Sequence, residues 1–193
     1  MRVFLAGATG VIGIRLVPLL VGEGHEVAGM TRSPEKAPTI AALRATPVVC
    51  DVFDATALVE AVVSFAPDLV IHQLTDLPDH LDQLSDYVAR NNRIRTEGTR
   101  NLLAAAVAVG ARLLAQSIAW TPPGSSAAID DHERLVLDAD GVVVRYGQLY
   151  GPGTYYPDAL PAPPRIQIDD AAQRTMALLD APRGVVVVAD ESG

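Results

Sequence analysis

Short apolar runs alternate along the chain with longer stretches in which apolar residues recur at helical spacing. Such runs are typical of strands buried on both faces of a sheet, and the longer stretches are typical of amphipathic helices. The runs predict strands at residues 2–6, 25–30, 47–52, 69–74, 112–118, 141–145, 166–168 and 185–189. The stretches predict helices at residues 11–22, 34–45, 55–65, 87–109, 127–139 and 169–180.

The regular alternation of predicted strands and helices indicates the fold class. Strands joined by helices pair in parallel, and ligands of such sheets bind at the carboxyl edge. We therefore predict an α/β fold, a Rossmann-type doubly wound parallel sheet in three layers, with a minimal substrate lobe. The 193 residues fit a single domain covering residues 1–193, and the turn-rich segment 151–166 is the candidate substrate lid.

Three glycines spaced three apart follow the first predicted strand. Gly7 permits a sharp turn, Gly10 lets backbone N–H groups approach a diphosphate, and Gly13 lets the next helix pack against its strand. That helix points its free N–H groups and its positive dipole end at the same anion. The turn predicts a dinucleotide site, with a purely structural turn as the alternative. The expected contacts are Gly7, Thr9, Gly10, Val11, Ile12 and Gly13.

The end of the second predicted strand bears on the choice of cofactor. A carboxylate at this place holds the ribose 2′-hydroxyl of NAD and repels a 2′-phosphate. Thr31, Arg32 and Ser33 stand there instead, and a guanidinium pairs well with a phosphate. The pattern favours NADP over NAD, with a solvated loop position for Arg32 as the alternative.

Composition argues against several classes of partner. The formal net charge is -8 and the basic residues are scattered, so a nucleic-acid partner is not expected. No apolar run reaches the roughly 18 residues of a membrane span, and a strand begins at residue 2, which predicts a cytoplasmic protein without a membrane partner. No metal site is expected, because the acidic and histidine residues at 130–133 are consecutive and point around a helix.

Several motifs carry a resemblance to a known family. They lie at residues 7–13, 50–52, 97–103, 117, 144–145, 150–153 and 168–171. With these motifs the chain resembles the short-chain dehydrogenase/reductase superfamily, in its extended or atypical NAD(P)-dependent epimerase/dehydratase branch, over nearly its full length. The resemblance implies a bound dinucleotide, with Asp51 and Val52 near the adenine and the segment after Arg145 near the nicotinamide. We count Leu74 and Tyr146 among the cofactor contacts.

The chain departs from this family at the catalytic pair. Family members carry a Tyr and a Lys four residues apart on the fifth helix, and the ammonium lowers the pKa of the Tyr that moves the proton. The only lysine of this sequence is Lys36, in the second predicted helix. Counted from Glu133, which resembles the family's helix glutamate, the two slots hold Ser125 and Ile129, whereas Ser117 is retained.

The substrate side is also reduced. Only about 15 residues separate the turn at 150–153 from the next predicted helix, which is short for a substrate domain built from loops. Arg95 stands where the family has a helix asparagine. A small, compact substrate is expected, with Ser117 and Tyr150 as candidate catalytic groups. Its expected contacts are His72, Trp120, Tyr155 and Tyr156.

These observations leave functions of different classes open. The first is an NADP-dependent oxidoreductase or isomerase that works without the Tyr-Lys pair. The second is a catalytically inactive module that senses NADP(H) and reports to a partner, and a non-redox catalyst on the same scaffold is a further alternative. Pairing of fifth helices across a two-fold axis, a habit of the family, would give a homodimer.

Overall fold

The computed structural model describes residues 1–120 and 122–190, and its centre is a seven-stranded parallel sheet. The strand order is β3-β2-β1-β4-β5-β6-β9, the order of the doubly wound Rossmann fold that the sequence predicts. These strands are β1 (Arg2–Ala6), β2 (Glu26–Thr31), β3 (Thr46–Val49), β4 (Leu69–His72), β5 (Arg112–Ile118), β6 (Val142–Tyr146) and β9 (Gly184–Val188).

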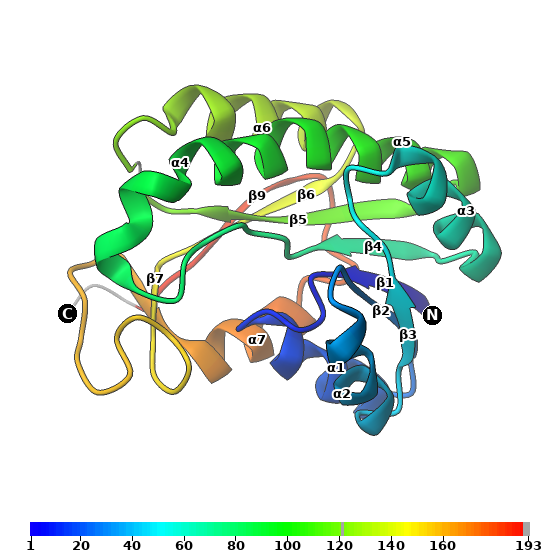
Figure 1. Cartoon of the computed structure of the whole chain (residues 1–193), viewed down its shortest axis with the longest axis horizontal. Coiled ribbons are helices and arrows are strands. Elements are labelled where there is room, and N and C mark those ends of the chain that lie inside the picture. Colours follow the sequence, from blue (N-terminus) through cyan, green and yellow to red (C-terminus); the bar gives the residue numbers. More distant parts are fainter. Residues whose placement is uncertain (121, 191–193) are drawn as a thin grey trace.

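Helices cover both faces of the sheet. They are α1 (Gly13–Gly22), α2 (Ala37–Ala42), α3 (Ala55–Phe65), α4 (Leu84–Arg93), α5 (Thr99–Val109), α6 (Ser126–Asp138) and α7 (Ile168–Met176). Figure 1 shows α1, α2 and α7 below the sheet and α3 to α6 above it. The molecule therefore has the three layers expected from its alternating pattern.

The central strand shows why the apolar runs form a buried sheet. Successive side chains of a strand point to opposite faces. Val3 and Leu5 pack into the apolar cluster on the α1 and α7 face, and Phe4 and Ala6 pack into the cluster on the opposite face. All four are completely buried, so β1 needs apolar residues at every position after Arg2.

The parallel register brings the strand ends to one edge. Ala6 of β1 pairs with Met30 of β2 and with His72 of β4, and Ser117 of β5 pairs with Arg145 of β6. The loops that follow these strands therefore meet at the carboxyl edge of the sheet, where the sequence places its candidate site.

Two predicted strands are shorter than expected. The third ends at Val49 and the fourth at His72, so residues 50–52 and 73–74 lie in the loops at the carboxyl edge. The second predicted helix divides into a short 3-10 turn at Pro34–Lys36 and α2, which ends at Ala42. Apolar side chains in these loops extended the predicted runs beyond the hydrogen-bonded elements.

The prediction of one uninterrupted helix at 87–109 is wrong. The helix begins earlier, at Leu84, and a π turn at Ile94–Gly98 separates α4 from α5. A π turn carries one more residue than an α turn and often marks a functional place. It leaves the apolar periodicity almost unchanged, so the sequence pattern does not reveal it.

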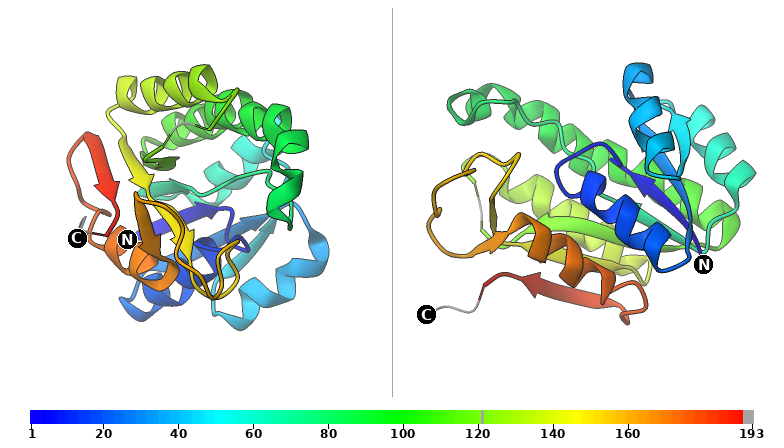
Figure 2. Two further views of the ribbon diagram at one scale, coloured as in Figure 1. Left: turned by 90° about the vertical axis from the view of Figure 1, so that its left-hand side faces the viewer. Right: turned by 90° about the horizontal axis from the view of Figure 1, so that it is seen from below.

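The minimal substrate lobe contains a small second sheet. β7 (Gln148–Tyr150), within a passage that the sequence assigns to turns, pairs in parallel with β8 (Arg165–Gln167). The loop of residues 151–164 joins them, and in Figure 2 it lies at the same end of the molecule as the beginning of α4. Within residues 1–120 and 122–190, no helix has the length and apolar character needed to cross a bilayer.

Candidate functional site

The turn between β1 and α1 is shaped for close backbone approach. Gly7 has a φ of 91°, in the left-handed region that favours glycine, and a Cβ there would lie 2.8 Å from the backbone of Gln73. A Cβ at Gly13 would lie 2.1 Å from the carbonyl oxygen of Gly7. Neither position can carry a side chain without moving the turn.

The start of α1 leaves backbone donors for an anion. The Gly10 N–H closes the turn on the Gly7 carbonyl, but within residues 1–120 and 122–190 the N–H groups of Val11 and Ile12 donate to no backbone oxygen. The nearby Arg15 donates to the Val11 carbonyl of this turn, to the Pro152 carbonyl and to Asp169. The helix dipole and the free N–H groups together suit a diphosphate.

The end of β2 lies directly beside the glycine turn. Thr31 Oγ1 lies 3.3 Å from Thr9 Oγ1 and accepts a hydrogen bond from the Ser33 N–H. The Arg32 side chain is 58% exposed, and its Nη2 lies 3.5 Å from Asp76 Oδ1. Arg32 is therefore at the sheet edge, exposed to solvent and already facing one carboxylate.

That carboxylate, Asp76, was not singled out from the sequence. Its residue is only 7% exposed, and both of its oxygens accept hydrogen bonds from Arg90 at 3.0 Å. Its backbone N–H donates to Asn91 Oδ1. Asp76 fixes the loop after β4 to α4 and sets an anion beside Arg32. The segment of residues 75–86 contains several aspartates, so only the fold distinguishes Asp76 from the others.

Asp51 and Val52 lie next along the same edge. Asp51 is exposed and its Oδ1 accepts the Phe53 N–H, while the Val52 carbonyl accepts a hydrogen bond from Asn101 Nδ2. The preceding residue, Cys50, donates its N–H to the Thr31 carbonyl. The structure thus brings together the sequence-predicted contacts that follow β1, β2 and β3.

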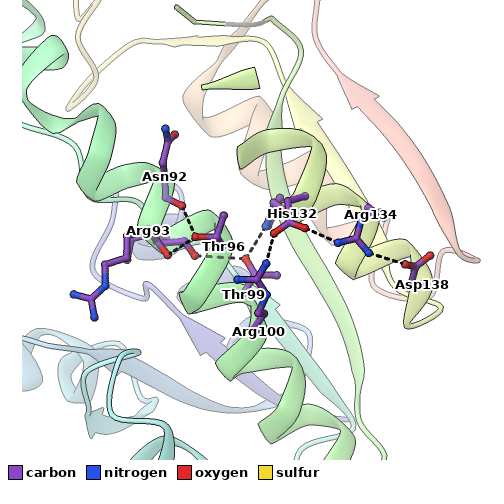
Figure 3. Close-up of polar contacts among 10 residues, drawn as sticks. Asn92, Arg93, Thr96, Thr99, Arg100, His132, Arg134 and Asp138 are labelled. Atoms are coloured by element: carbon purple, nitrogen blue, oxygen red, sulfur yellow. Dashed lines mark hydrogen bonds and ion pairs between the residues drawn. The ribbon is translucent and has the colours of Figure 1, made fainter. Parts of the chain in front are cut away.

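Farther along the edge, a buried hydrogen-bond chain joins β4, α5 and α6. The Leu74 N–H donates to His72 Nδ1, so His72 Nε2 carries the proton and donates to Thr99 Oγ1. Thr99 in turn donates to His132 Nδ1, and His132 Nε2 donates to the Gln116 carbonyl. Figure 3 shows Thr99 and His132 facing each other between the two helices. Every polar atom of this chain is satisfied with both histidines neutral.

Burial holds both histidines in that neutral form. It lowers the pKa of His72 well below its ordinary value, and the neighbouring His132 and Arg95 lower it further. Burial also lowers the pKa of His132, to about 4. Near neutral pH these rings are structural hydrogen-bonding groups, and His72 is 1% exposed, which removes it from contact with a substrate in this conformation.

A second buried cluster surrounds Ser117. Its hydroxyl, completely buried, donates to Glu133 Oε1 at 2.6 Å. Arg145 donates to both oxygens of the same carboxylate, through Nε and Nη2. Burial raises the pKa of Glu133, but the hydrogen bonds from Arg145 and Ser117 outweigh it and lower the pKa below its usual value. Ser117 therefore faces an ionised carboxylate.

Comparison with known proteins defines the family. The model of the NAD dependent epimerase/dehydratase family matches residues 3–139. The chain belongs to this family. A 3-diazoavenalumate denitrifying reductase from a Streptomyces species is 42% identical over 81% of this chain, and the chain spans 59% of that relative's length. A 3-beta-hydroxysteroid dehydrogenase of Mycolicibacterium neoaurum is 32% identical over 56% of this chain and 29% of its own length.

Solved structures of the family share the fold. The Thermus thermophilus UDP-glucose 4-epimerase, determined in complex with NAD, has a TM-score of 0.79 and 21% identity, covering 100% of this chain and 79% of its own. The WbmH enzyme of Bordetella bronchiseptica, in complex with NAD+, has a TM-score of 0.77 and 19% identity, covering 99% of this chain and 76% of its own.

The structure places both positions that the sequence analysis assigned to the family's Tyr and Lys. Ser125, the expected Tyr position, directly precedes α6 and is 4% exposed, and Ile129, the expected Lys position, is 7% exposed. Ile129 and Trp120 line a small hollow of about 120 Å³ that reaches Asp130, Glu133 and Arg145. Glu133 and Arg145 are paired with each other there.

Tyr146 and Tyr150, both expected in the site, have different surroundings. Tyr146 faces the α7 layer, completely enclosed, where its hydroxyl contacts Thr175 and accepts a hydrogen bond from Gln73. Burial raises its pKa to about 12. Tyr150 lies at the surface and donates to Asp190, and burial together with that carboxylate raises its pKa. Neither hydroxyl is near ionisation at neutral pH.

The expected substrate contacts are not gathered in one pocket. His72 is in the buried chain, Trp120 is at the α6 hollow, and Tyr155 donates its hydroxyl to the Pro78 carbonyl. Tyr156 lies in the same loop, half-buried, and its carbonyl accepts the Gly151 N–H. The contact between Tyr155 and Pro78 joins the loop after β7 to the loop after β4.

Proposed function

We propose that the chain forms the cofactor-binding part of an NADP-dependent reductase that acts on a small, compact substrate. The observation that carries this proposal is an intact glycine turn beside Arg32, next to a region where the proton-transferring Tyr and Lys are replaced. The 42% identity to a reductase adds support. The first turn of α1 would bind the diphosphate, Arg32 with Thr31 and Ser33 the 2′-phosphate, and Asp51 and Val52 the adenine side.

The lack of a Tyr-x-x-x-Lys motif limits the reductions that the protein can assist. NADPH, when bound, supplies a hydride. Reduction of a carbonyl then also needs a proton for the alkoxide, and a positioned acid contributes about 10²- to 10⁴-fold to that step. A diazonium group needs no such proton: hydride brings both electrons, the C–N bond breaks, and the products are a C–H bond and dinitrogen.

We therefore propose diazonium compounds as the substrate class. The Streptomyces relative is named for the denitrifying reduction of a diazo compound, which is consistent with this chemistry. An acceptor that already carries positive charge would also gain from the acidic protein, whose formal net charge is -8.

The test compares two substrates of similar size. Purified protein is mixed with NADPH deuterated at the transferable position and with either benzenediazonium or benzaldehyde, with matched mixtures that lack protein. We expect one NADPH oxidised and one dinitrogen released per diazonium, with deuterium on the arene carbon. Benzaldehyde should react at least about 100-fold more slowly. Arene without deuterium, or a rate equal to the protein-free mixture, would contradict the proposal.

The alternative is an NADP(H)-responsive module without catalysis. The hydrogen bond of Ser117 favours this alternative. The Ser117 hydroxyl donates to ionised Glu133, and this bond opposes transfer of its proton to a substrate. The contact of Tyr155 with Pro78 would carry a movement of the Asp76 loop to the loop after β7. Micromolar NADPH binding without turnover of either substrate would select this alternative.

A further inference from the structure

The π turn between α4 and α5 carries a largely buried arginine whose guanidinium has no acceptor in the described structure. Arg95 is only 5% exposed. In residues 1–120 and 122–190 three charged side chains are buried, those of Asp76, Arg95 and Glu133. Asp76 and Glu133 each form an ion pair, whereas Arg95 makes no hydrogen bond or ion pair with any residue of that part of the chain.

The nearest carboxylate is already occupied. Glu133 lies close enough to Arg95 to interact with its charge. Its Oε1 accepts from Ser117 and from Arg145 Nε, and its Oε2 accepts from Arg145 Nη2. Three donors therefore hold this carboxylate, and the donors of Arg95 remain unused.

The carboxylates of this region do not bond to Arg95. Arg145 bonds both oxygens of Glu133, and Asp130 lies with these two residues at the hollow beside α6. The two histidines beside Arg95 are neutral, and burial already lowers the pKa of Arg95. A cation without an acceptor in a largely buried place gains from an anion that joins it. Arg95 is therefore a candidate anion-binding group.

Its position matches the place where a substrate would be held. Ser117 lies near the carboxyl end of β5, and the π turn that bears Arg95 packs against α6, which holds Ile129 and follows directly after Ser125. Arg95 itself replaces the amide of the family's helix asparagine by a longer, charged group. A π turn changes the direction of a side chain relative to a regular helix, which is how such turns serve binding sites.

We propose that Arg95 binds the carboxylate of the substrate. The planar fork of a guanidinium matches the two oxygens of a carboxylate, and the enclosed position favours a small organic acid over a large anion. This inference deepens the proposed function and rests on it, because it adds a carboxylate to the electrophilic substrate. Arg95 would orient the substrate and balance the buried charge, without taking part in proton transfer.

The test uses binding alone, so its outcome is independent of turnover. Benzoate and its neutral analogue benzamide are titrated into the full chain at constant ionic strength, without cofactor, and followed by calorimetry and thermal unfolding. We expect benzoate to bind and raise the Tm and benzamide to do neither. Arg95→Met should lose benzoate binding by about 100-fold, and Arg95→Lys by about tenfold, because it keeps the charge but loses the fork.

Unliganded stability separates a binding role from a structural one. Removing a costly buried cation should leave the Tm of unliganded Arg95→Met unchanged or higher. The matched control is Arg93→Met, at an exposed arginine near the π turn that pairs with Glu97, and it should leave benzoate binding unchanged. A lowered Tm of unliganded Arg95→Met, or equal binding of benzoate and benzamide by the natural chain, would overturn the proposal.

Discussion

The two halves of the sheet's carboxyl edge use their polar groups in opposite ways. Around β1 and β2, the N–H groups of Val11 and Ile12 make no backbone bond in the described structure, and Arg32 is largely exposed. Around β5 and β6, Ser117 and Arg145 both bond to Glu133, and the histidines bond to Thr99. The first half retains the donors of a binding site, and the second has turned most of its polar groups inward.

The largest effect is expected from Gly13→Ala in the binding half. A Cβ at 2.1 Å from the Gly7 carbonyl would displace the turn, so the free energy of unfolding should fall by about 4 kcal/mol and NADPH binding should be lost. Denaturant unfolding and fluorescence titration measure the two effects. Gly22→Ala, where a Cβ meets open space, is the control and should change stability by less than about 1 kcal/mol. Retained NADPH affinity in Gly13→Ala would break the assignment.

Glu133→Gln tests the inward-turned half. The change leaves Arg145 without its carboxylate partner and removes a negative charge that acts on Arg95, which should cost about 3 kcal/mol in the free energy of unfolding. NADPH affinity should remain as in the natural chain, which would show that the β1–β2 half binds independently of the β5–β6 half. The exposed pair of Glu97 with Arg93 provides the control, since Glu97→Gln should lower the free energy of unfolding far less than Glu133→Gln does. A parallel loss of NADPH affinity would show that the halves are coupled.

The buried histidines predict a pH dependence of stability. Their folded-state pKa values lie below the ordinary 6.5, so the unfolded chain takes up protons first and stability falls as the pH falls. The loss should begin near pH 6.5 and, for His132, amount to about 3 kcal/mol by pH 4. Unfolding curves across this range measure it. His132→Gln should flatten the dependence, while His80→Gln, at an exposed histidine, should leave it unchanged.

The smallest effect concerns the choice of cofactor. Arg32→Ala should weaken NADPH by about 10- to 100-fold, the worth of one charge-assisted contact, and NADH by less than about twofold. Titration of both cofactors gives the ratio. Arg100→Ala, at an exposed arginine paired with Asp131 away from the edge, should alter neither affinity. If NADPH and NADH weaken equally, Arg32 does not contact the 2′-phosphate.

The sequence predicts the fold class because burial of both sheet faces imposes a pattern that survives any loop detail. The strand order and the three layers follow from the alternation of apolar runs and amphipathic stretches, and the glycines predict the β1–α1 turn. The limits of the strands were less certain, since apolar residues such as Val52 and Leu74 continue a run after its hydrogen bonds end. The π turn at Ile94–Gly98 hardly changes the spacing of the buried positions, so it cannot be recognised from the sequence pattern.

The sequence located candidate-site residues only where their place depends on backbone geometry. The contacts expected near Gly7 and Thr31 lie at the ends of β1 and β2, which the sequence located more closely than the ends of β3 and β4. Ser117 bonds to Glu133 of α6, and Tyr146 contacts Thr175 of α7. These partners depend on the face of the sheet to which each side chain points and on the helix that covers that face. The special position of Asp76 among several acidic residues and the isolation of Arg95 both follow from packing across layers.

The packing of α7 on α1 has a consequence for how the protein folds during synthesis. Leu16 and Leu20 of α1 share one apolar cluster with Ile168 and Ala172 of α7, and Arg15 reaches Asp169 across the same seam. Among the described helices, α1 is synthesised before all the others and α7 after them, so the part of the α1 face that meets α7 is covered late. Contacts so far apart in sequence slow folding. A nascent chain interrupted before α7 would expose this face of α1 and become a target for chaperones and proteases.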